Sequence, residues 1–414
     1  MLGIGWSKMR VSPIGIDFGA DTLKLLQVIP GDPPQLVAAA AATLPSESTS
    51  DPDARLAFYA AHLRQLIKTQ PFRGNRVMVS IPAAQMLVQN LQIPKSDEGE
   101  METQVGLQLR DRLNVNPSRM VVRSIPVAQI VRDGSPRTEV VCMAAGREAV
   151  MRYLELARRA KLEVVGMHSE PMTIIRAFSW LFRREADAAQ TTCFVDLGSL
   201  TTKVVMTHGG DLVFAKVIHA GGAHLNRRVA EQFELEIAEA RTRRMEAIHA
   251  EQQPQVVHAE STPAPAAAAA VPEPEGTGFA ILDAQLASSP TRHASLPSEQ
   301  PVTPEPEEMP AEFNPLPAEV VDCLIDELQL CVRYHQSLFP DRQIDKLVFL
   351  GGESRHVQLC QRIARSLRVG AQAGDPLARL HRSGKPAKPS EVAIDQPQPA
   401  WAVPMGLCIS EANL

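Results

Sequence analysis

Two distant stretches of the chain share one pattern of apolar and polar positions. Residues 14–28 run from an apolar segment through Asp17, Gly19 and Lys24 into a second apolar segment, and residues 193–207 repeat Asp, Gly and Lys at the same spacing. Apolar runs joined by a glycine-containing turn are typical of antiparallel β-hairpins, and we expect Gly19 to supply an unusual φ angle there. The repetition predicts two equivalent hairpins and a duplicated fold.

The spacing of apolar residues also predicts the elements around the hairpins. Helices are predicted over residues 53–69, 100–113, 147–160, 171–183, 223–250, 318–338 and 357–367, and strands over 36–42, 77–81, 85–93, 121–130, 138–144, 162–167 and 347–350. Residues 401–409 form another short apolar stretch around Gly406. The predicted elements therefore include both strands and helices.

The composition changes between residues 251 and 316. Thirteen of the 33 prolines fall between Pro254 and Pro317, and this region is rich in alanine and acidic residues. Such a segment buries too little apolar surface to offset the entropy of ordering, so we predict that it is disordered. Within it, residues 278–286 are more apolar and could form either a short docking motif or a transient turn.

Charge and cysteine usage exclude several classes of protein. A net charge of -5 without a basic stripe argues against a general nucleic-acid binder. The six cysteines show no C-x-x-C pair, which suits a reducing cytosol. No stretch approaches 18 consecutive apolar residues, so we expect no transmembrane segment and a membrane role only through a partner.

The polar residues of the hairpins suit a nucleotide phosphate chain. Backbone N–H groups in a glycine turn form a concave anion site, and nearby hydroxyls add donors. Asp17 and Asp196, one in each hairpin, could hold Mg²⁺ through its water shell. The predicted nucleotide-binding residues are Gly19, Ala20, Thr22, Lys24, Gly198, Ser199, Thr201, Thr202, Gly221, Gly222, Gly351 and Gly352, the predicted metal ligands are Asp17 and Asp196, and the candidate catalytic carboxylates are Asp196 and Glu170.

These assignments have structural alternatives. The two aspartates could cap turns, and Lys24 and Lys203 could form salt bridges rather than contact phosphate. Glu170 could cap a helix. The pair Gly221-Gly222 could be a tight turn between a strand and a helix.

A family resemblance joins these motifs. The two hairpins, Gly351-Gly352 and the stretch around Gly406 resemble, in this order, the phosphate 1, phosphate 2, adenosine and connecting motifs of the superfamily of actin, hexokinase and the heat-shock chaperones. Within it, residues 13–245 and 317–409 resemble the PilM family of type IV pilus assembly, which is related to FtsA. The resemblance implies a bilobed actin-like (ribonuclease H-like) α/β fold that carries an inserted 1C subdomain.

The resemblance also implies a domain organisation. The first actin-like lobe is expected at 13–87 with 163–190, the 1C subdomain at 88–162, the second lobe at 191–250 with 317–414, and the acidic insertion at 251–316.

The function implied is that of a cytoplasmic scaffold that binds ATP and Mg²⁺. It would dock the short cytoplasmic tail of a bitopic inner-membrane protein such as PilN, contact other inner-membrane pilus components, and be able to self-associate. Two departures from the family pattern argue for weak or absent hydrolysis. Asp21 replaces a small hydroxyl residue beside the phosphates, and Thr242 replaces a lysine, with Arg243 and Arg244 beside it.

Other functions stay open. A GspL-like component of type II secretion, an FtsA-like division component and a nucleotide-free pseudo-ATPase scaffold would share the fold. A sugar or acetate kinase would need a substrate loop that the sequence does not show. The sequence contains no G-x-x-x-x-G-K-[ST], H-E-x-x-H or G-x-S-x-G motif.

Overall fold

The computed structural model describes residues 11–49, 51–95, 98–113, 116–252, 313–381 and 396–414. The predicted disorder of the acidic insertion, and the apolar stretch within it, therefore fall almost wholly outside the described residues. None of the helices in these ranges combines the length and the apolar character needed to cross a membrane.

The first half of the fold is built on a five-stranded sheet of order β3-β2-β1-β4-β8. Its strands are β1 (Ile14–Phe18), β2 (Thr22–Ile29), β3 (Gln35–Thr43), β4 (Arg76–Ile81) and β8 (Glu163–Ser169). Helices α1 (Pro52–Thr69) and α3 (Arg147–Arg159) pack on one face. There the ring of Phe18 lies 5.2 Å from Tyr59 and 5.0 Å from Tyr153, centroid to centroid, so the first hairpin is anchored in this core.

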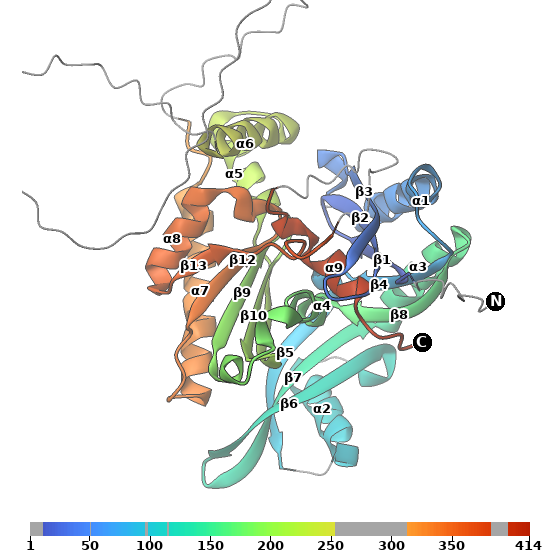
Figure 1. The fold of residues 1–414 in the computed structure, drawn as a ribbon. Helices are drawn as coiled ribbons and strands as arrows, with labels where there is room; N and C mark the ends of the chain where they lie inside the picture. The colour runs from blue at the N-terminus through green and yellow to red at the C-terminus, as the bar shows by residue number, and fades with distance from the viewer. Residues whose placement is uncertain (1–10, 50, 96–97, 114–115, 253–312, 382–395) are drawn as a thin grey trace, which may run out of the picture. The chain divides into compact units, whose positions relative to one another are not determined.

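The second half repeats this plan with the order β11-β10-β9-β12-β13. Its strands are β9 (Thr191–Leu197), β10 (Thr202–His208), β11 (Asp211–Ile218), β12 (Lys346–Leu350) and β13 (Ala371–Ala373), and α7 (Ala318–Leu338) and α8 (Val357–Leu367) pack on one face. In both sheets the first three strands in chain order pair antiparallel. The last two run parallel to the first strand, which is β1 in one sheet and β9 in the other. The predicted duplication is confirmed (Figure 1).

A third, three-stranded sheet of order β5-β7-β6 interrupts the first half. It comprises β5 (Met86–Pro94), β6 (Met120–Arg132) and β7 (Ser135–Gly146), and α2 (Glu98–Leu113) packs on it through Val105 and Leu109. Helix α3 instead buries Tyr153 and Leu156 in the core of the first sheet. We therefore propose that the inserted unit comprises residues 86–146 rather than 88–162.

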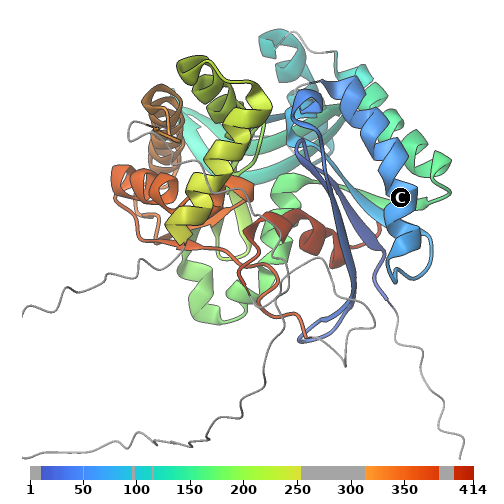
Figure 2. The same cartoon turned by 90° about the horizontal axis from the view of Figure 1, so that it is seen from above.

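Two short helices connect the halves. Helix α4 (Glu170–Ala177) follows β8, and α9 (Ala402–Cys408) lies against β1 and β2 (Figure 2). The two helices cross so closely that a Cβ on Gly406 would clash with the carbonyl of Thr173. A single apolar core runs past them and joins both sheets, with Ile174 and Phe178 packed beside Phe194.

The predicted helix over 223–250 is wrong as one element. It is two helices, α5 (Gly222–Phe233) and α6 (Ile237–Gln252), because Glu234 takes a left-handed conformation with φ of 53° and ends α5. The predicted helix over 171–183 likewise ends at Ala177. Short 3₁₀ turns are η1 (Ser46–Ser48), η2 (Ala83–Gln85), η3 (Pro117–Arg119), η4 (Ser179–Phe182), η5 (Glu185–Ala189), η6 (Gly352–Arg355) and η7 (Pro399–Trp401).

Candidate functional site

A cavity of about 520 Å³ lies between the two hairpins. The turns β1–β2 and β9–β10, the first residue of α4, helix α6 and the segment that follows β12 all contribute to its wall. Most of the predicted site residues line it, namely Asp17, Gly19, Ala20, Thr22, Lys24, Glu170, Asp196, Gly198, Ser199, Thr201, Gly351 and Gly352. The fold thus brings together residues that lie far apart in the sequence.

Each hairpin places an aspartate opposite a lysine. Asp17 of β1 is in register with Lys24 of β2, and Asp196 of β9 is in register with Lys203 of β10. Residues in register on neighbouring strands share a face of the sheet, so the spacing Asp-x-Gly-x₄-Lys produces an ion pair. The Nζ to Oδ2 distance is 3.5 Å in the first hairpin and 2.9 Å in the second. The salt-bridge interpretation of both lysines therefore holds in this structure.

The second lysine also reaches the connecting helix. Nζ of Lys203 lies 3.1 Å from Oε2 of Glu170, and Oε1 of Glu170 accepts the N–H of Ala83 at 3.0 Å. Burial raises the pKa of Glu170, although Lys203 opposes that shift. Burial alone would lower the pKa of Lys203, but the carboxylates around it outweigh this effect and the pKa is raised. Lys203 is thus a buried cation that neutralises a carboxylate cluster.

Burial also acts on the carboxylate of the first hairpin. The pKa of Asp17 is raised by burial, and Lys24 and Lys203 oppose the shift. The side chain of Asp17 is buried at the wall of the cavity. Burial removes water that would stabilise the charged carboxylate, so a cation that binds Asp17 would stabilise its charged form in place of that water.

The two turn glycines are required by the close packing of each turn. Neither Gly19 nor Gly198 has a positive φ, so the expectation of an unusual φ at Gly19 is wrong. The reason for glycine is steric, because a Cβ would lie 2.7 Å from the carbonyl oxygen of Thr22 in the first turn and 2.8 Å from that of Thr201 in the second. Glycine therefore lets each hairpin close tightly beside the cavity.

The pair Gly351-Gly352 follows β12. Gly351 has φ 86° and ψ 174°, a region that side chains rarely adopt, and a Cβ there would clash with Oδ1 of Asp196 and the carbonyl of Leu197. A Cβ on Gly352 would meet nothing within 4 Å. The chain therefore passes directly over Asp196 and then leaves open space for a ligand.

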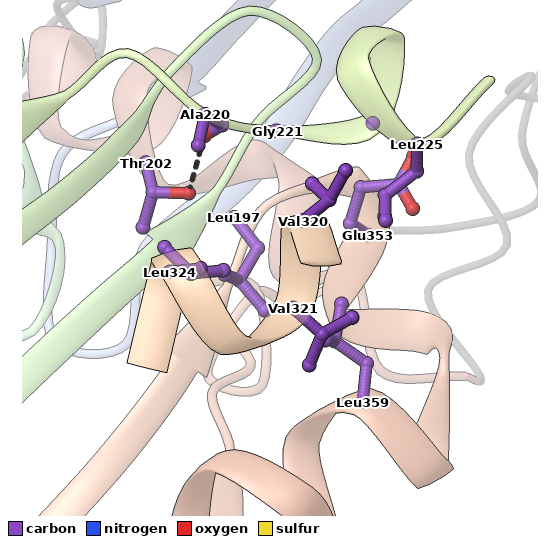
Figure 3. Close-up of a pocket in the computed structure, with 11 residues that line it drawn as sticks. Leu197, Thr202, Ala220, Gly221, Leu225, Val320, Val321, Leu324, Glu353 and Leu359 are labelled. Atoms are coloured by element: carbon purple, nitrogen blue, oxygen red, sulfur yellow. Dashed lines mark hydrogen bonds between the residues drawn. The ribbon is translucent and has the colours of Figure 1, made fainter. Parts of the chain in front are cut away.

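Three predicted residues lie elsewhere. Thr202, Gly221 and Gly222 line a separate small cavity of about 10 Å³, roughly the space of one water (Figure 3). The hydroxyl of Thr202 donates to the carbonyl of Ala220 at 2.8 Å, as the dashed line in Figure 3 shows. The N–H of Gly222 donates to Gly198 at 3.0 Å. We assign these three residues to the packing of β10 against the turn between β11 and α5, as the tight-turn alternative predicted for the glycines.

Sequence reasoning missed the cation that α6 supplies to the cavity. Arg241 lines the cavity and pairs with Asp21, Nη2 to Oδ2, at 2.8 Å. Of the expected substitutes, Arg243 pairs with Glu239 on its own helix at 2.8 Å. The chain breaks at Glu234, and α6 begins only at Ile237. A single continuous helix would have placed different side chains on the inner face, so the sequence pattern did not indicate that Arg241 faces the cavity.

Arg244 is buried and holds the fold together. Its guanidinium donates to Glu353 at 2.7 Å, to Asn226 at 2.5 Å, and to the carbonyls of Gly222 and Pro315. Thr242 is exposed, at the position where the family lysine was expected. Neither residue lines the 520 Å³ cavity.

The cavity carries more negative than positive side chains among the described residues. The acidic ones are Asp17, Asp21, Glu170, Asp196 and Glu353, and the basic ones are Lys24, Lys203, Arg241 and Arg355. Within the described ranges, no three His, Cys, Asp or Glu side chains are close enough to form a complete metal site. Hard oxygen ligands completed by water are the set that Mg²⁺ prefers, so the chemistry of the two aspartates fits a hydrated Mg²⁺.

A second cavity of about 430 Å³ lies between the first sheet and the inserted sheet. Its wall includes Val121 and Ile125 of β6, Met172 and Arg176 of α4, and residues 411–414. Helix α4 therefore borders both cavities, because its first residue, Glu170, lies in the wall of the other one.

The segment 411–414 lies along the outer edge of β8. The side-chain amide of Asn413 donates to the carbonyl of Met167 at 3.1 Å and accepts its N–H at 2.9 Å. The N–H of Asn413 donates to the carbonyl of Val165 at 3.1 Å. This segment closes one side of the second cavity.

A family model described as Type IV pilus assembly protein PilM matches residues 15–257. The chain belongs to the PilM family. The predicted resemblance and the predicted actin-like α/β fold are thereby confirmed. The comparison with curated proteins found no match.

Three solved structures are also similar to this chain. A PilM–PilN type IV pilus biogenesis complex matches with a TM-score of 0.67 and 19% identity, covering 97% of this chain and 98% of that one. The ethanolamine utilization protein EutJ from Carboxydothermus hydrogenoformans has a TM-score of 0.47, with 13% identity and coverage of 97% and 89%. The activator of 2-hydroxyisocaproyl-CoA dehydratase from Clostridium difficile, with bound ADPNP, has a TM-score of 0.39, with 10% identity and coverage of 96% and 92%.

Proposed function

We propose that this PilM-family protein is a cytoplasmic scaffold of type IV pilus assembly that binds ATP and Mg²⁺ in the 520 Å³ cavity. One observation carries the proposal: two equivalent hairpins set an Asp–Lys pair and a close glycine turn on opposite walls of a single cavity. A duplicated pair of turns suits a ligand with a chain of anionic groups that both halves can bind.

The residues of the cavity have separate parts in this proposal. Backbone N–H groups of the turns at Gly19 and Gly198, with the hydroxyls of Thr22, Ser199 and Thr201, would bind phosphate oxygens. Asp17 and Asp196 would hold the water shell of Mg²⁺, which when bound would neutralise phosphate charge.

We expect hydrolysis to be weak or absent. A general base needs a carboxylate free to accept a proton from water. The candidates Glu170 and Asp196 are both paired with Lys203, at 3.1 Å and 2.9 Å. ATP would thus act through its binding energy, which favours one arrangement of the two halves.

Calorimetric titration of Mg-ATP tests the nucleotide site. Wild-type protein should bind in the micromolar range, and Asp17→Ala and Asp196→Ala should each weaken binding about a hundredfold or more. Asp53→Ala is the matched control, because Asp53 is exposed at the start of α1 and does not line the cavity. Wild-type protein that binds no Mg-ATP, or aspartate variants that bind normally while still folded, would reject the proposal.

We further propose that the 430 Å³ cavity docks the cytoplasmic tail of a PilN-like inner-membrane protein. One solved structure that matches over most of both chains, with a TM-score of 0.67, is of a PilM–PilN complex, although that likeness itself shows only the fold. The cavity has a largely apolar wall, and its charged lining residues are Arg123, Arg176 and Glu411, so basic residues outnumber acidic ones, which suits a short apolar segment with an acidic residue. Docking would hold this protein at the inner membrane, where other pilus components and further copies of the chain could assemble on it.

Two valines on the same strand test the docking site. Val121 of β6 lines the cavity, whereas Val131 of β6 is 77% exposed and does not. Val121→Arg should weaken binding of a fluorescent tail peptide at least about tenfold, and Val131→Arg should leave it unchanged. Equal affinities for the two variants, measured by fluorescence anisotropy, would exclude this cavity as the docking site.

A further inference from the structure

Arg241 connects the two halves at the wall of the 520 Å³ cavity. It belongs to α6 of the second half, and its partner Asp21 lies in the β1–β2 turn of the first half, 2.8 Å away. The same guanidinium lies 3.4 Å from the carbonyl oxygen of Leu44 and 3.4 Å from the hydroxyl of Ser46. The side chain thus reaches across the cavity from one half to the other.

The ion pair between Arg241 and Asp21 is more exposed than the ion pairs of Lys203. Lys203 is enclosed by two buried carboxylates, whereas Arg241 and Asp21 are 21% and 34% exposed at their side chains. An arginine in this position binds phosphate through a planar pair of N–H donors, and the highly charged phosphates of ATP would compete well with a single carboxylate. Asp21 is also in the turn whose backbone is the proposed phosphate site. Its carboxylate and the phosphates would therefore compete for the guanidinium of Arg241.

We infer that Arg241 contacts the phosphates of the bound nucleotide and that Asp21 holds its guanidinium before the nucleotide binds. This inference rests on the proposed nucleotide site and assigns it a further binding residue. Asp21 is then a competitor built into the phosphate turn. It explains how an acidic residue is tolerated at this position, since its charge is neutralised from the opposite wall.

Two variants that break the same ion pair give opposite results under this inference. Asp21→Asn releases Arg241 and removes a repulsive charge, so ATP should bind about tenfold more tightly. Arg241→Gln removes the phosphate contact and leaves Asp21 unpaired, so ATP should bind about tenfold more weakly or worse. If the pair only clamped the halves together, both variants would shift the affinity in the same direction.

Calorimetric titration with ATP, ADP and adenosine measures these shifts. Adenosine affinity should be unchanged in both variants, because adenosine has no phosphate. Arg243→Gln is the control, because Arg243 is also on α6 but pairs with Glu239 outside the cavity lining. Melting temperatures verify that each variant is folded.

The outcomes separate the two proposals. ATP shifts of opposite sign in the two variants support the inference. Shifts of the same sign, or equal shifts for adenosine and ATP, overturn it while the nucleotide site stands. Wild-type protein that binds none of the three ligands overturns both.

Discussion

Nζ of Lys203 lies 3.1 Å from Oε2 of Glu170, although the lysine belongs to the second hairpin and the glutamate begins the helix that follows the first sheet. The same Nζ lies 2.9 Å from Asp196. All three side chains are buried. This cluster therefore joins the two halves through charges that water does not screen well.

Replacing Lys203 should be strongly destabilising. Lys203→Met would leave buried carboxylates without their cation, at a cost of about 3–5 kcal/mol in the free energy of unfolding. Lys216→Met is the matched control, because Lys216 and its partner Glu327 are each 36% exposed at the side chain, and it should cost about 1 kcal/mol or less. Urea unfolding measures both. Similar losses in the two variants would contradict a special role for the buried cluster.

The adjacent glycines after β12 should respond very differently to alanine. Gly351→Ala places a side chain at φ 86° and against Asp196, so we expect a loss of about 3 kcal/mol or more in unfolding free energy. Gly352→Ala enters open space and should change stability by less than about 1 kcal/mol. Chemical denaturation compares the two variants. A Gly351 variant as stable as the Gly352 variant would show that the turn relaxes freely.

Mild acid should destabilise the protein through a pair of histidines in the second half. Nε2 of His208 lies 2.9 Å from Nε2 of His335, and Phe339 packs on both rings. Burial, with a contribution from Arg342, lowers the pKa of His208 to about 4 and also lowers that of His335. An unfolded histidine titrates near pH 6.5, so as pH falls below that value the unfolded chain binds protons that the folded chain does not, and stability falls.

The comparison of variants isolates this effect. Buried Asp17 and Glu170 have raised pKa values and act in the opposite sense at acidic pH. We expect His208→Asn to reduce the loss of melting temperature between pH 7 and pH 5 by about 2 °C. His249→Asn, at an exposed position on α6, should leave the pH dependence unchanged. Identical pH profiles for wild type and His208→Asn would contradict the assignment.

Removing Mg²⁺ should weaken ATP binding about a hundredfold. The described lining of the cavity has one more acidic than basic side chain, and ATP adds further negative charge. Titration of ATP in the presence of EDTA measures the loss, and adenosine in the same buffer is the control. ATP affinity that does not change with Mg²⁺ would show that side-chain cations alone neutralise the phosphates.

The boundaries of the acidic insertion can be tested by deletion. Sequence reasoning placed its end at residue 316, but Leu316 is 7% exposed in the core of the second half and Pro315 accepts a hydrogen bond from Arg244 at 3.0 Å. Replacing residues 254–312 by a flexible Gly-Ser linker should change the melting temperature by less than about 2 °C. Extending the deletion to residue 316 should cost about 2 kcal/mol. A large loss from the shorter deletion would show that the insertion supports the fold.

The amino-acid sequence by itself determined the repeated framework. The register of the hairpin follows from local spacing, since Lys24 comes seven positions after Asp17 and a tight turn must place them opposite each other. Apolar periodicity likewise fixed most strands and helices, and α7 and α8 have the predicted bounds. These features depend on neighbours in the chain, so a sequence pattern can reveal them.

Only the tertiary structure decided how the pieces meet. Glu170 and Lys203 come together because α4 follows the first sheet and packs beside the second, and no local pattern encodes that distance. The break at Glu234 set the phase of α6 and brought Arg241, rather than Arg243, to the cavity. Thr202 does not line the cavity, and its hydroxyl instead donates to the carbonyl of Ala220 in the turn before α5. The direction of a side chain and its long-range partner depend on the packing of the whole chain. The spacing of residues in the sequence indicates only which residues can be neighbours within one local element.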